Sequence, residues 1–276
     1  TKYQCGHADV LMGAVLSNNT RAFTDLERRN RILGLGVSPA DCDLVLRGLL
    51  TLPLRYRQQA ENGLLVATEL KQHKAIARVL HPEFPECPGH EFYKRDFTGF
   101  ASIFSVVLQS HYTDEQACKI IDSLKLFKIA YSWGGPESLG LVVNVADSRK
   151  RYLLDANGQC GPILRLAIGL EDPNDLIADL MLALDAALCV LTVWLALYLR
   201  SGEWVSLAGP ALVAVLASVV LALPVFITSG LYRAIFRYSG LPAMVAVARA
   251  MVLYGIAFAA IFTFCVVDGV PRTVGL

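Results

Sequence analysis

The chain has 276 residues, of which 54% are hydrophobic, and it carries a formal net charge of +1. No block of Lys and Arg stands out, so the sequence lacks the basic footprint of nucleic-acid-binding proteins and no nucleic-acid partner is expected. Charge is unevenly spread, because residues 1–181 hold 41 of the 49 Asp, Glu, Lys and Arg residues and the last 95 residues hold eight. This asymmetry predicts a soluble globular part followed by a membrane part.

The first 75 residues predict one strand and two or three helices. The apolar run Val10–Leu16 is typical of a buried strand, and the charged stretch Asn19–Ile32 predicts a helix. Between residues 40 and 75, apolar side chains recur at helical spacing with charges between them, which indicates one or two long amphipathic helices. Pro53 predicts a break between them.

Beyond residue 75 the pattern alternates between short apolar runs and amphipathic stretches. Strands are predicted at Ala75–Leu80, Ala101–Leu108, Leu139–Val145 and Ile163–Ile168. The sequence Thr113-Asp-Glu-Gln116 is a capping box that opens a helix to about Phe127, and Asp172-Pro173 starts a last helix. Together these elements predict a small α/β domain whose sheet is covered on one face.

Three charge-poor runs in the last third predict about three transmembrane helices, at residues 182–199, 205–229 and 242–267. A very apolar soluble helical bundle is the alternative. Arg233 and Arg237 lie in the loop between the second and third runs, and the positive-inside rule places such a loop in the cytoplasm. The soluble part is then cytoplasmic, and the C-terminal part lies in the lipid bilayer of a bacterial inner membrane. Asp185 starts the first run, where an interfacial position is favoured over a proton relay.

The seven cysteines are scattered and form no C-x-x-C pair, which indicates reduced thiols of a cytosolic domain. Cys87 and His90 have a C-x-x-H spacing, but no second pair of metal-ligand residues lies nearby in the sequence. No metal site is therefore expected.

Four motifs occur in an order typical of one enzyme family. They are Thr1-Lys-Tyr-Gln-Cys-Gly-His-Ala-Asp9, Gly89-His-Glu-Phe-Tyr-Lys-Arg-Asp-Phe-Thr-Gly99, Tyr131-Ser-Trp-Gly-Gly135 and Leu164-Arg-Leu-Ala-Ile-Gly-Leu-Glu-Asp172. Over residues 1 to about 180 the chain resembles the pyridoxal-phosphate enzymes of cysteine and methionine metabolism. The Trp that follows Ser in the third motif is typical of their cystathionine β-lyase branch.

The resemblance implies the C-terminal part of a fold type I, aspartate-aminotransferase-like α/β enzyme. Residues 1–50 would end the cofactor-binding large domain, and residues 51–180 would form the small domain. The implied reaction splits cystathionine into homocysteine, pyruvate and ammonia in methionine biosynthesis. In the family, the residues that stack on the cofactor ring and bind its nitrogen precede the lysine. The chain is therefore expected to be a piece without lyase activity of its own, and the full-length family is expected to form homo-oligomers.

The resemblance also implies roles for five residues. Lys2 would bind the aldehyde of pyridoxal phosphate and then act as a base, and Thr1 would bind the cofactor phosphate. Ser132 would position the lysine amine, and Trp133 would line the same pocket. Arg165 would clamp the substrate carboxylate, because a planar two-donor fork matches that group. Without this context, Lys2 is interpreted as a solvated surface lysine and Arg165 as an edge-strand arginine.

A second resemblance concerns residues 181–276. The segment Gly230–Gly240 and the apolar runs around it resemble the N-terminal membrane region of bacterial nucleoside-diphosphate-sugar epimerase/dehydratases of polysaccharide synthesis. This implies a joint between two unrelated genes near Met181. It also leaves an alternative function open, a non-enzymatic membrane-anchoring region.

Overall fold

The computed structural model describes residues 2–145, 160–201, 209–228 and 241–264. The chain divides into two compact units, Thr1–Ile177 and Ala178–Leu276, and each is described by itself. The division falls inside one continuous helix, α7 (Pro173–Ser201), close to the boundary predicted at residue 180. Residues 1–50 belong to the same unit as the small domain. The subdivision at residue 50 stays a prediction.

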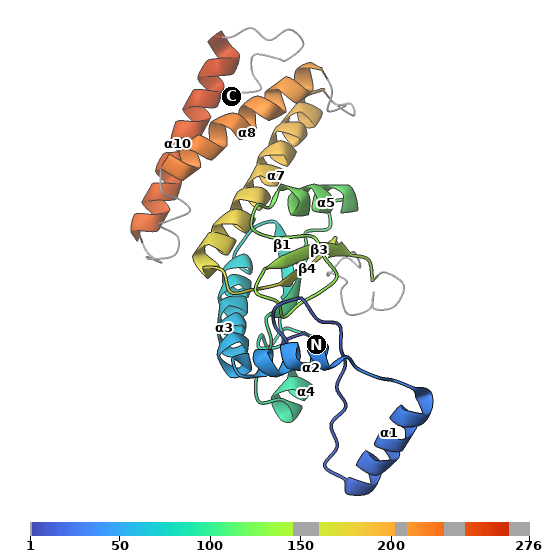
Figure 1. Ribbon diagram of the computed structural model, residues 1–276. Helices are drawn as coiled ribbons and strands as arrows, with labels where there is room; N and C mark the ends of the chain where they lie inside the picture. The colour runs from blue at the N-terminus through green and yellow to red at the C-terminus, as the bar shows by residue number, and fades with distance from the viewer. Residues whose placement is uncertain (1, 146–159, 202–208, 229–240, 265–276) are drawn as a thin grey trace. The chain divides into compact units, whose positions relative to one another are not determined.

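Among the described residues, five helices lie wholly within the first unit (Figure 1). They are α1 (Thr20–Leu33), α2 (Pro39–Leu49), α3 (Leu52–Leu70), α4 (His90–Asp96) and α5 (Asp114–Ser123). The Asn19 side chain caps α1 by accepting from the Ala22 amide. The predicted capping box of Thr113 and Gln116 forms at the start of α5. The predicted break at Pro53 is confirmed, because α2 ends before it and α3 starts there.

Four antiparallel strands form one sheet in the order β1-β2-β4-β3. They are β1 (Ile76–Leu80), β2 (Ile103–Leu108), β3 (Leu139–Val143) and β4 (Ile163–Ala167). All four predicted strands are confirmed with small changes at their ends. Helix α5 stops at Ser123, short of the predicted Phe127, because the backbone of Leu124 adopts an extended conformation. The chain after Leu124 can therefore run beside β3, where the Lys128 amide donates to the Ser138 carbonyl and the Lys128 carbonyl accepts from the Gly140 amide.

The two faces of the sheet differ in burial. Phe104, Val106, Leu164 and Leu166 alternate onto one face, and each is 3% exposed or less. On this face α5 approaches β3, since a Cβ at Gly140 would lie 3.2 Å from the Ile121 side chain. On the opposite face, Ile103, Ser105 and Arg165 stay half-buried. The face of the sheet that carries Arg165 is thus the more open one.

The predicted strand at Val10–Leu16 is wrong. The segment has no regular secondary structure, and the side chains of Leu11 and Leu16 are 100% and 94% exposed. A strand requires a hydrogen-bonding neighbour, and the described sheet takes its four strands from residues 76–167. Apolar composition alone therefore does not make this segment a strand.

The second unit contains α7 residues from Ala178 onward, α8 (Pro210–Thr228) and α10 (Leu241–Phe264). One core cluster comprises Val193, Leu197, Ala214, Val215 and Phe258, so all three helices pack together there. The Ser218 and Tyr254 hydroxyls share a hydrogen bond of 2.6 Å between α8 and α10.

Among the described residues, two helical segments are long and apolar enough to cross a membrane, judged by length and composition only. They are Pro173–Leu199 and Ala211–Thr228, whose most apolar windows have a mean hydropathy of 2.3 and 2.6, respectively. The third predicted span contains only a shorter apolar helix in the described part, Ala248–Ile261. The described residues do not include Trp204, the loop that contains Arg233 and Arg237, or residues 265–267. Three helices are confirmed, whereas three spans stay a prediction.

Candidate active site

Lys2 and Ser132 meet, although they lie 130 residues apart in the sequence. The Lys2 Nζ donates a hydrogen bond of 3.0 Å to the Ser132 Oγ, and it lies 4.4 Å over the Trp133 ring. Lys2 starts a turn in which the Gly6 amide donates to the Lys2 carbonyl. Its side chain is half-buried, so the interpretation as a solvated surface lysine is wrong.

Arg165 lies in the middle of β4, between β2 and β3, so the interpretation as an edge-strand arginine is also wrong. Its guanidinium carbon lies 5.8 Å from the centre of the Trp133 ring and 5.7 Å from that of the Tyr131 ring. The Arg165 Nη2 is buried and has no hydrogen-bond partner among the described residues. A buried, unpartnered donor is costly, and an anionic ligand such as a carboxylate would satisfy it.

The structure thus brings four of the five predicted site residues to one place. Trp133 joins them, because both the Lys2 amine and the Arg165 guanidinium lie near its ring. Thr1, the predicted phosphate ligand, lies outside the described residues. In the described part of the chain, no group of three His, Cys, Asp or Glu residues could hold a metal ion, so the expectation about metals stays a prediction.

The turn that carries Lys2 is anchored by its own side chains. The Tyr3 hydroxyl lies 3.1 Å from the Ser102 Oγ and accepts from the Ser102 amide at 3.2 Å. The Cys5 side chain is 1% exposed, and its thiol donates to the Asp9 carboxylate at 2.9 Å. This donation lowers the pKa of Asp9. The segment that follows Lys2 is therefore folded back on itself.

The loop that carries Ser132 and Trp133 is fixed at its far end. The Glu171 carboxylate accepts from both the amide (2.6 Å) and the hydroxyl (2.8 Å) of Ser138. The Ser138 Oγ in turn accepts from the Gly169 amide at 2.9 Å. Because residues 169–171 directly follow β4, this network ties the Ser132 loop to the strand of Arg165.

Gly134 allows the loop to approach Lys2 closely. Its φ is +78°, and a Cβ there would lie 2.9 Å from the backbone of Lys2 and of Tyr3. Only glycine tolerates both the left-handed conformation and this contact. Gly134, in the third motif, therefore sets the distance between the Ser132 loop and the Lys2 turn.

The sequence analysis did not single out Arg55, Gln59 and Asn62, three buried polar residues of α3. They contact the loops around the site. The signal was present, because they follow one another at i, i+4 and i+7 and so share one helix face. The sequence analysis considered only the apolar side chains of this segment and the charges between them.

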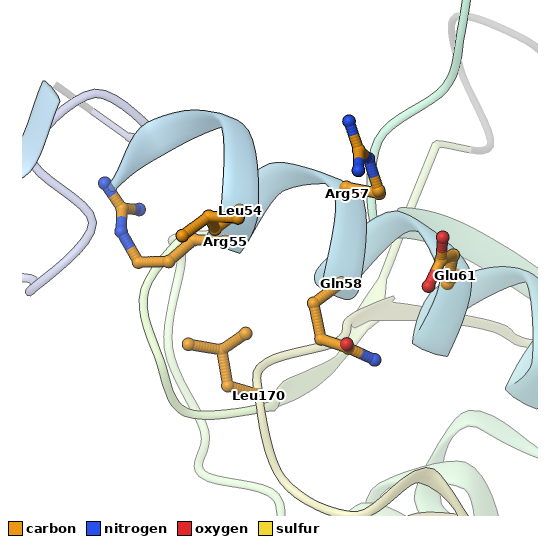
Figure 2. A pocket seen from close by; sticks show the side chains of 6 residues that line it. All are labelled: Leu54, Arg55, Arg57, Gln58, Glu61 and Leu170. Carbon is orange, nitrogen blue, oxygen red and sulfur yellow. The ribbon is translucent and has the colours of Figure 1, made fainter. Parts of the chain in front are cut away.

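An open pocket of about 420 Å³ lies along α3 and shares Arg55 with these three residues (Figure 2). Its lining comprises Leu54, Arg55, Arg57, Gln58, Glu61 and Leu170. None of the sequence-predicted site residues lines it. The candidate active site therefore rests on the converging side chains of Lys2, Ser132, Trp133 and Arg165.

Pyridoxal phosphate is compatible with this arrangement. Its aldehyde requires an amine that is free to react, and the contacts of the Lys2 Nζ given above are a hydroxyl and a ring. No ion pair between Lys2 and a carboxylate occurs among the described residues. The unpartnered Arg165 donor suits an amino-acid carboxylate beside it.

Comparison with known proteins agrees with this chemistry. The sequence profile of the family described as "Cys/Met metabolism PLP-dependent enzyme" matches residues 1–185. Cystathionine beta-lyase of Escherichia coli is 42% identical over 183 residues, which are 65% of this chain and 45% of that protein. The L-alanine/L-glutamate racemase of Wolbachia pipientis is 36% identical over 192 residues, 70% of this chain and 47% of that protein.

Solved structures are similar over the same region. A cystathionine gamma synthase from Xanthomonas oryzae, in complex with aminoacrylate and cysteine, is 34% identical with a TM-score of 0.58, and the match covers 67% of this chain and 48% of that one. A methionine gamma lyase from Micromonospora echinospora is 30% identical with a TM-score of 0.55, over 66% and 47% of the two chains. The chain spans about half the length of these relatives. The family match ends at residue 185, so the resemblance stated for residues 181–276 stays a prediction.

Proposed function

The chain belongs to the pyridoxal-phosphate-dependent enzymes of cysteine and methionine metabolism, and from this membership we propose that it is part of a carbon–sulfur β-lyase. The proposed substrate is cystathionine, which with one water gives homocysteine, pyruvate and ammonia. The chain covers 45% of the length of the E. coli lyase, so the activity is proposed for these residues together with a cofactor-binding half like that of the lyase. One observation carries the proposal. The Lys2 amine donates to the Ser132 hydroxyl at 3.0 Å and shares the Trp133 ring with Arg165, whose Nη2 has no partner among the described residues.

Each residue has a task that follows from its position. Pyridoxal phosphate supplies an electron sink for the substrate when it is bound. The Lys2 Nζ would hold the cofactor by its aldehyde, and the same amine would take the proton from the substrate α-carbon. Ser132 holds this Nζ from one side and the Trp133 ring lies beneath it, which limits the positions that the base can adopt. Arg165 binds the substrate carboxylate through two parallel donors and so fixes which C–H bond faces Lys2.

The preference for β-elimination is the finer part of the proposal, because the relatives include a racemase and γ-acting enzymes. Several of the compared relatives with the highest identity are cystathionine beta-lyases, from E. coli, Salmonella typhimurium and Bordetella avium. The Trp133 that follows Ser132 supports the same branch. A racemase would retain the C–S bond, so the products distinguish the activities.

The cofactor role of Lys2 is tested on the chain itself. The purified chain is incubated with pyridoxal phosphate, reduced with borohydride, and mapped by mass spectrometry. We expect attachment at Lys2 at lower cofactor concentration than at the exposed Lys119. Equal attachment at both lysines would contradict the proposal.

The lyase role is tested by supplying the cofactor-binding half of a relative. The chain is co-expressed with the preceding part of the E. coli lyase, and pyruvate release from cystathionine is followed. Lys2→Ala is expected to abolish the release and Lys119→Ala to leave it unchanged. Pyruvate release by the Lys2→Ala assembly would refute the assignment.

We further propose that α7 and α8 cross the inner membrane of a bacterium, with the N-terminal unit on the cytoplasmic side. Support comes from their length and hydropathy, and from the fact that only 28% of each apolar window is buried. Gly202 and Ile235 lie outside the described residues, and cysteines placed there test the orientation. An impermeant reagent on intact cells should label Gly202→Cys but not Ile235→Cys, and the reverse pattern would exclude this topology. The proposed role of residues 181–276 as an anchor of a polysaccharide enzyme stays a prediction.

A further inference from the structure

One face of α3 is polar and buried, which is unusual for a helix packed on a sheet. Arg55, Gln59 and Asn62 are 9%, 0% and 3% exposed, and their spacing places them in one row along the helix. We call these three residues the α3 ridge. Burying polar groups costs free energy unless their partners are well placed. The hydrogen-bond partners of the α3 ridge therefore indicate its role.

At one end of the ridge, Arg55 holds the turn that follows Lys2. Its Nη1 donates to the Tyr3 carbonyl at 2.9 Å, and its Nη2 donates to the Gly48 carbonyl at 2.7 Å. Its Nε donates to the Thr51 Oγ1 at 3.0 Å. Gly6 lies so close that a Cβ there would overlap the guanidinium. Figure 2 shows the Arg55 side chain reaching away from Leu170 and the rest of the pocket.

The Arg55 guanidinium contacts neutral oxygens, and no carboxylate pairs with it among the described residues. Burial lowers its pKa. The Gly48 carbonyl belongs to the last turn of α2, where the helix dipole favours a cation, and it also accepts from the Thr51 amide at 3.3 Å. The charge is thus stabilised by the same backbone that it holds in place.

The other two ridge residues hold the other two parts of the site. The Gln59 Nε2 donates to the Gly135 carbonyl at 2.6 Å, in the loop of Ser132 and Trp133. The Asn62 Nδ2 donates at 3.2 Å to the carbonyl of Glu171, in the loop that follows the strand of Arg165. The Asn62 Oδ1 accepts from Gln58, which fixes the orientation of its amide.

We propose that Arg55, Gln59 and Asn62 are positioning residues, which align the Lys2 turn, the Ser132 loop and the Arg165 strand along one helix. The proposal rests on the proposed function of Lys2. Each ridge residue donates to the backbone of a different segment, and each of these segments carries a side chain of the candidate site. A rigid helix therefore fixes the three segments relative to one another.

The test measures the Lys2 amine without cofactor. The 276-residue chain in detergent is treated with an amine-acylating reagent over a range of pH, and modification at Lys2 and at the exposed Lys119 is read by mass spectrometry. Arg55→Gln removes the charged donor to the Tyr3 carbonyl, so acylation of Lys2 relative to Lys119 should rise about tenfold. Arg57→Gln removes an exposed charge from the same helix and should change it less than about twofold.

Two further measurements separate positioning from general stability. The rise in Lys2 acylation should be partly reversed in Arg55→Lys, because lysine keeps a charged donor at this position. The urea midpoint is recorded for each variant, since a purely structural role would make Lys2 acylation follow the midpoint and not the presence of the charged donor.

Asn62→Asp keeps the side-chain volume but replaces the amide that donates to the Glu171 carbonyl with a carboxylate, which cannot donate. Amide exchange in residues 163–171 should then rise about tenfold. This variant also tests the ridge if Arg55→Gln does not fold. Unchanged Lys2 acylation in Arg55→Gln, or unchanged exchange in Asn62→Asp, would overturn the proposal. Failure of pyridoxal phosphate to attach at Lys2 would count against the proposed function alone.

Discussion

Gly134→Ala should loosen the contact between the Ser132 loop and the Lys2 turn. The φ of Gly134 is +78°, and a left-handed backbone costs a residue with a side chain roughly 1–2 kcal/mol. The new Cβ would also lie 2.9 Å from backbone atoms of Lys2 and Tyr3, so one of the two segments must move. Together we expect a cost of about 2 kcal/mol, which corresponds to a rise of about 30-fold in the population of the opened turn.

The neighbouring glycine provides a matched control. A Cβ on Gly135 would meet the Ala8 Cβ at 3.6 Å, which is ordinary van der Waals contact, and the φ of Gly135 is not positive. Gly135→Ala should therefore change the stability of the turn by less than about 0.5 kcal/mol. The two variants make the same chemical change at adjacent positions.

Thiol labelling reports the opening. Cys5 lies in the Lys2 turn and is 1% exposed, whereas Cys42 and Cys118 are exposed and serve as internal standards. Labelling of the intact chain in detergent is mapped by mass spectrometry, and the Cys5 rate is divided by that of the standards. The reasoning fails if Cys5 labels equally fast in Gly134→Ala and Gly135→Ala.

Further predictions concern the clamp, acid stability, the isolated chain and the helices of the second unit. In the co-expressed assembly, Arg165→Ala should lower kcat/KM by two or more decades, or about 3 kcal/mol, and Arg165→Lys should recover only part, as steady-state kinetics with cystathionine will show. Burial lowers the pKa of His81 to about 4 from an ordinary 6.5, so the unfolded chain binds more protons between these values. Stability should be fully present above pH 6.5 and fall toward pH 4, and urea midpoints of His81→Asn should show a flatter profile. The 276-residue chain alone should release no pyruvate from cystathionine, because it spans 45% of the lyase that it matches, and release that depends on Lys2 would show otherwise. Ser218→Ala and Tyr254→Phe should show a coupling of about 0.6 kcal/mol in a double-mutant cycle of unfolding in detergent.

Local chemistry in the sequence determined the elements and the identity of the central residues. Capping residues such as Asn19 and Thr113 set where helices begin, since they satisfy free amides within a few residues. The resemblance of the motifs around Lys2 and Arg165 to one enzyme family implied the chemistry, and the residue types fit it, because reactive amines and carboxylate clamps require them. These features depend on neighbours in the chain and can be read from it.

Only the tertiary structure decided which distant residues meet. The sequence does not show that β4 lies between β2 and β3, so it left open whether Arg165 stood on an edge strand. It also could not show that the ridge of α3 faces the loops of the site, because a buried polar residue and a solvated one have the same helical spacing. The error at Val10–Leu16 has the same origin. A strand exists only where another segment offers backbone partners, and such pairing between distant segments is a property of the folded chain that local periodicity does not contain.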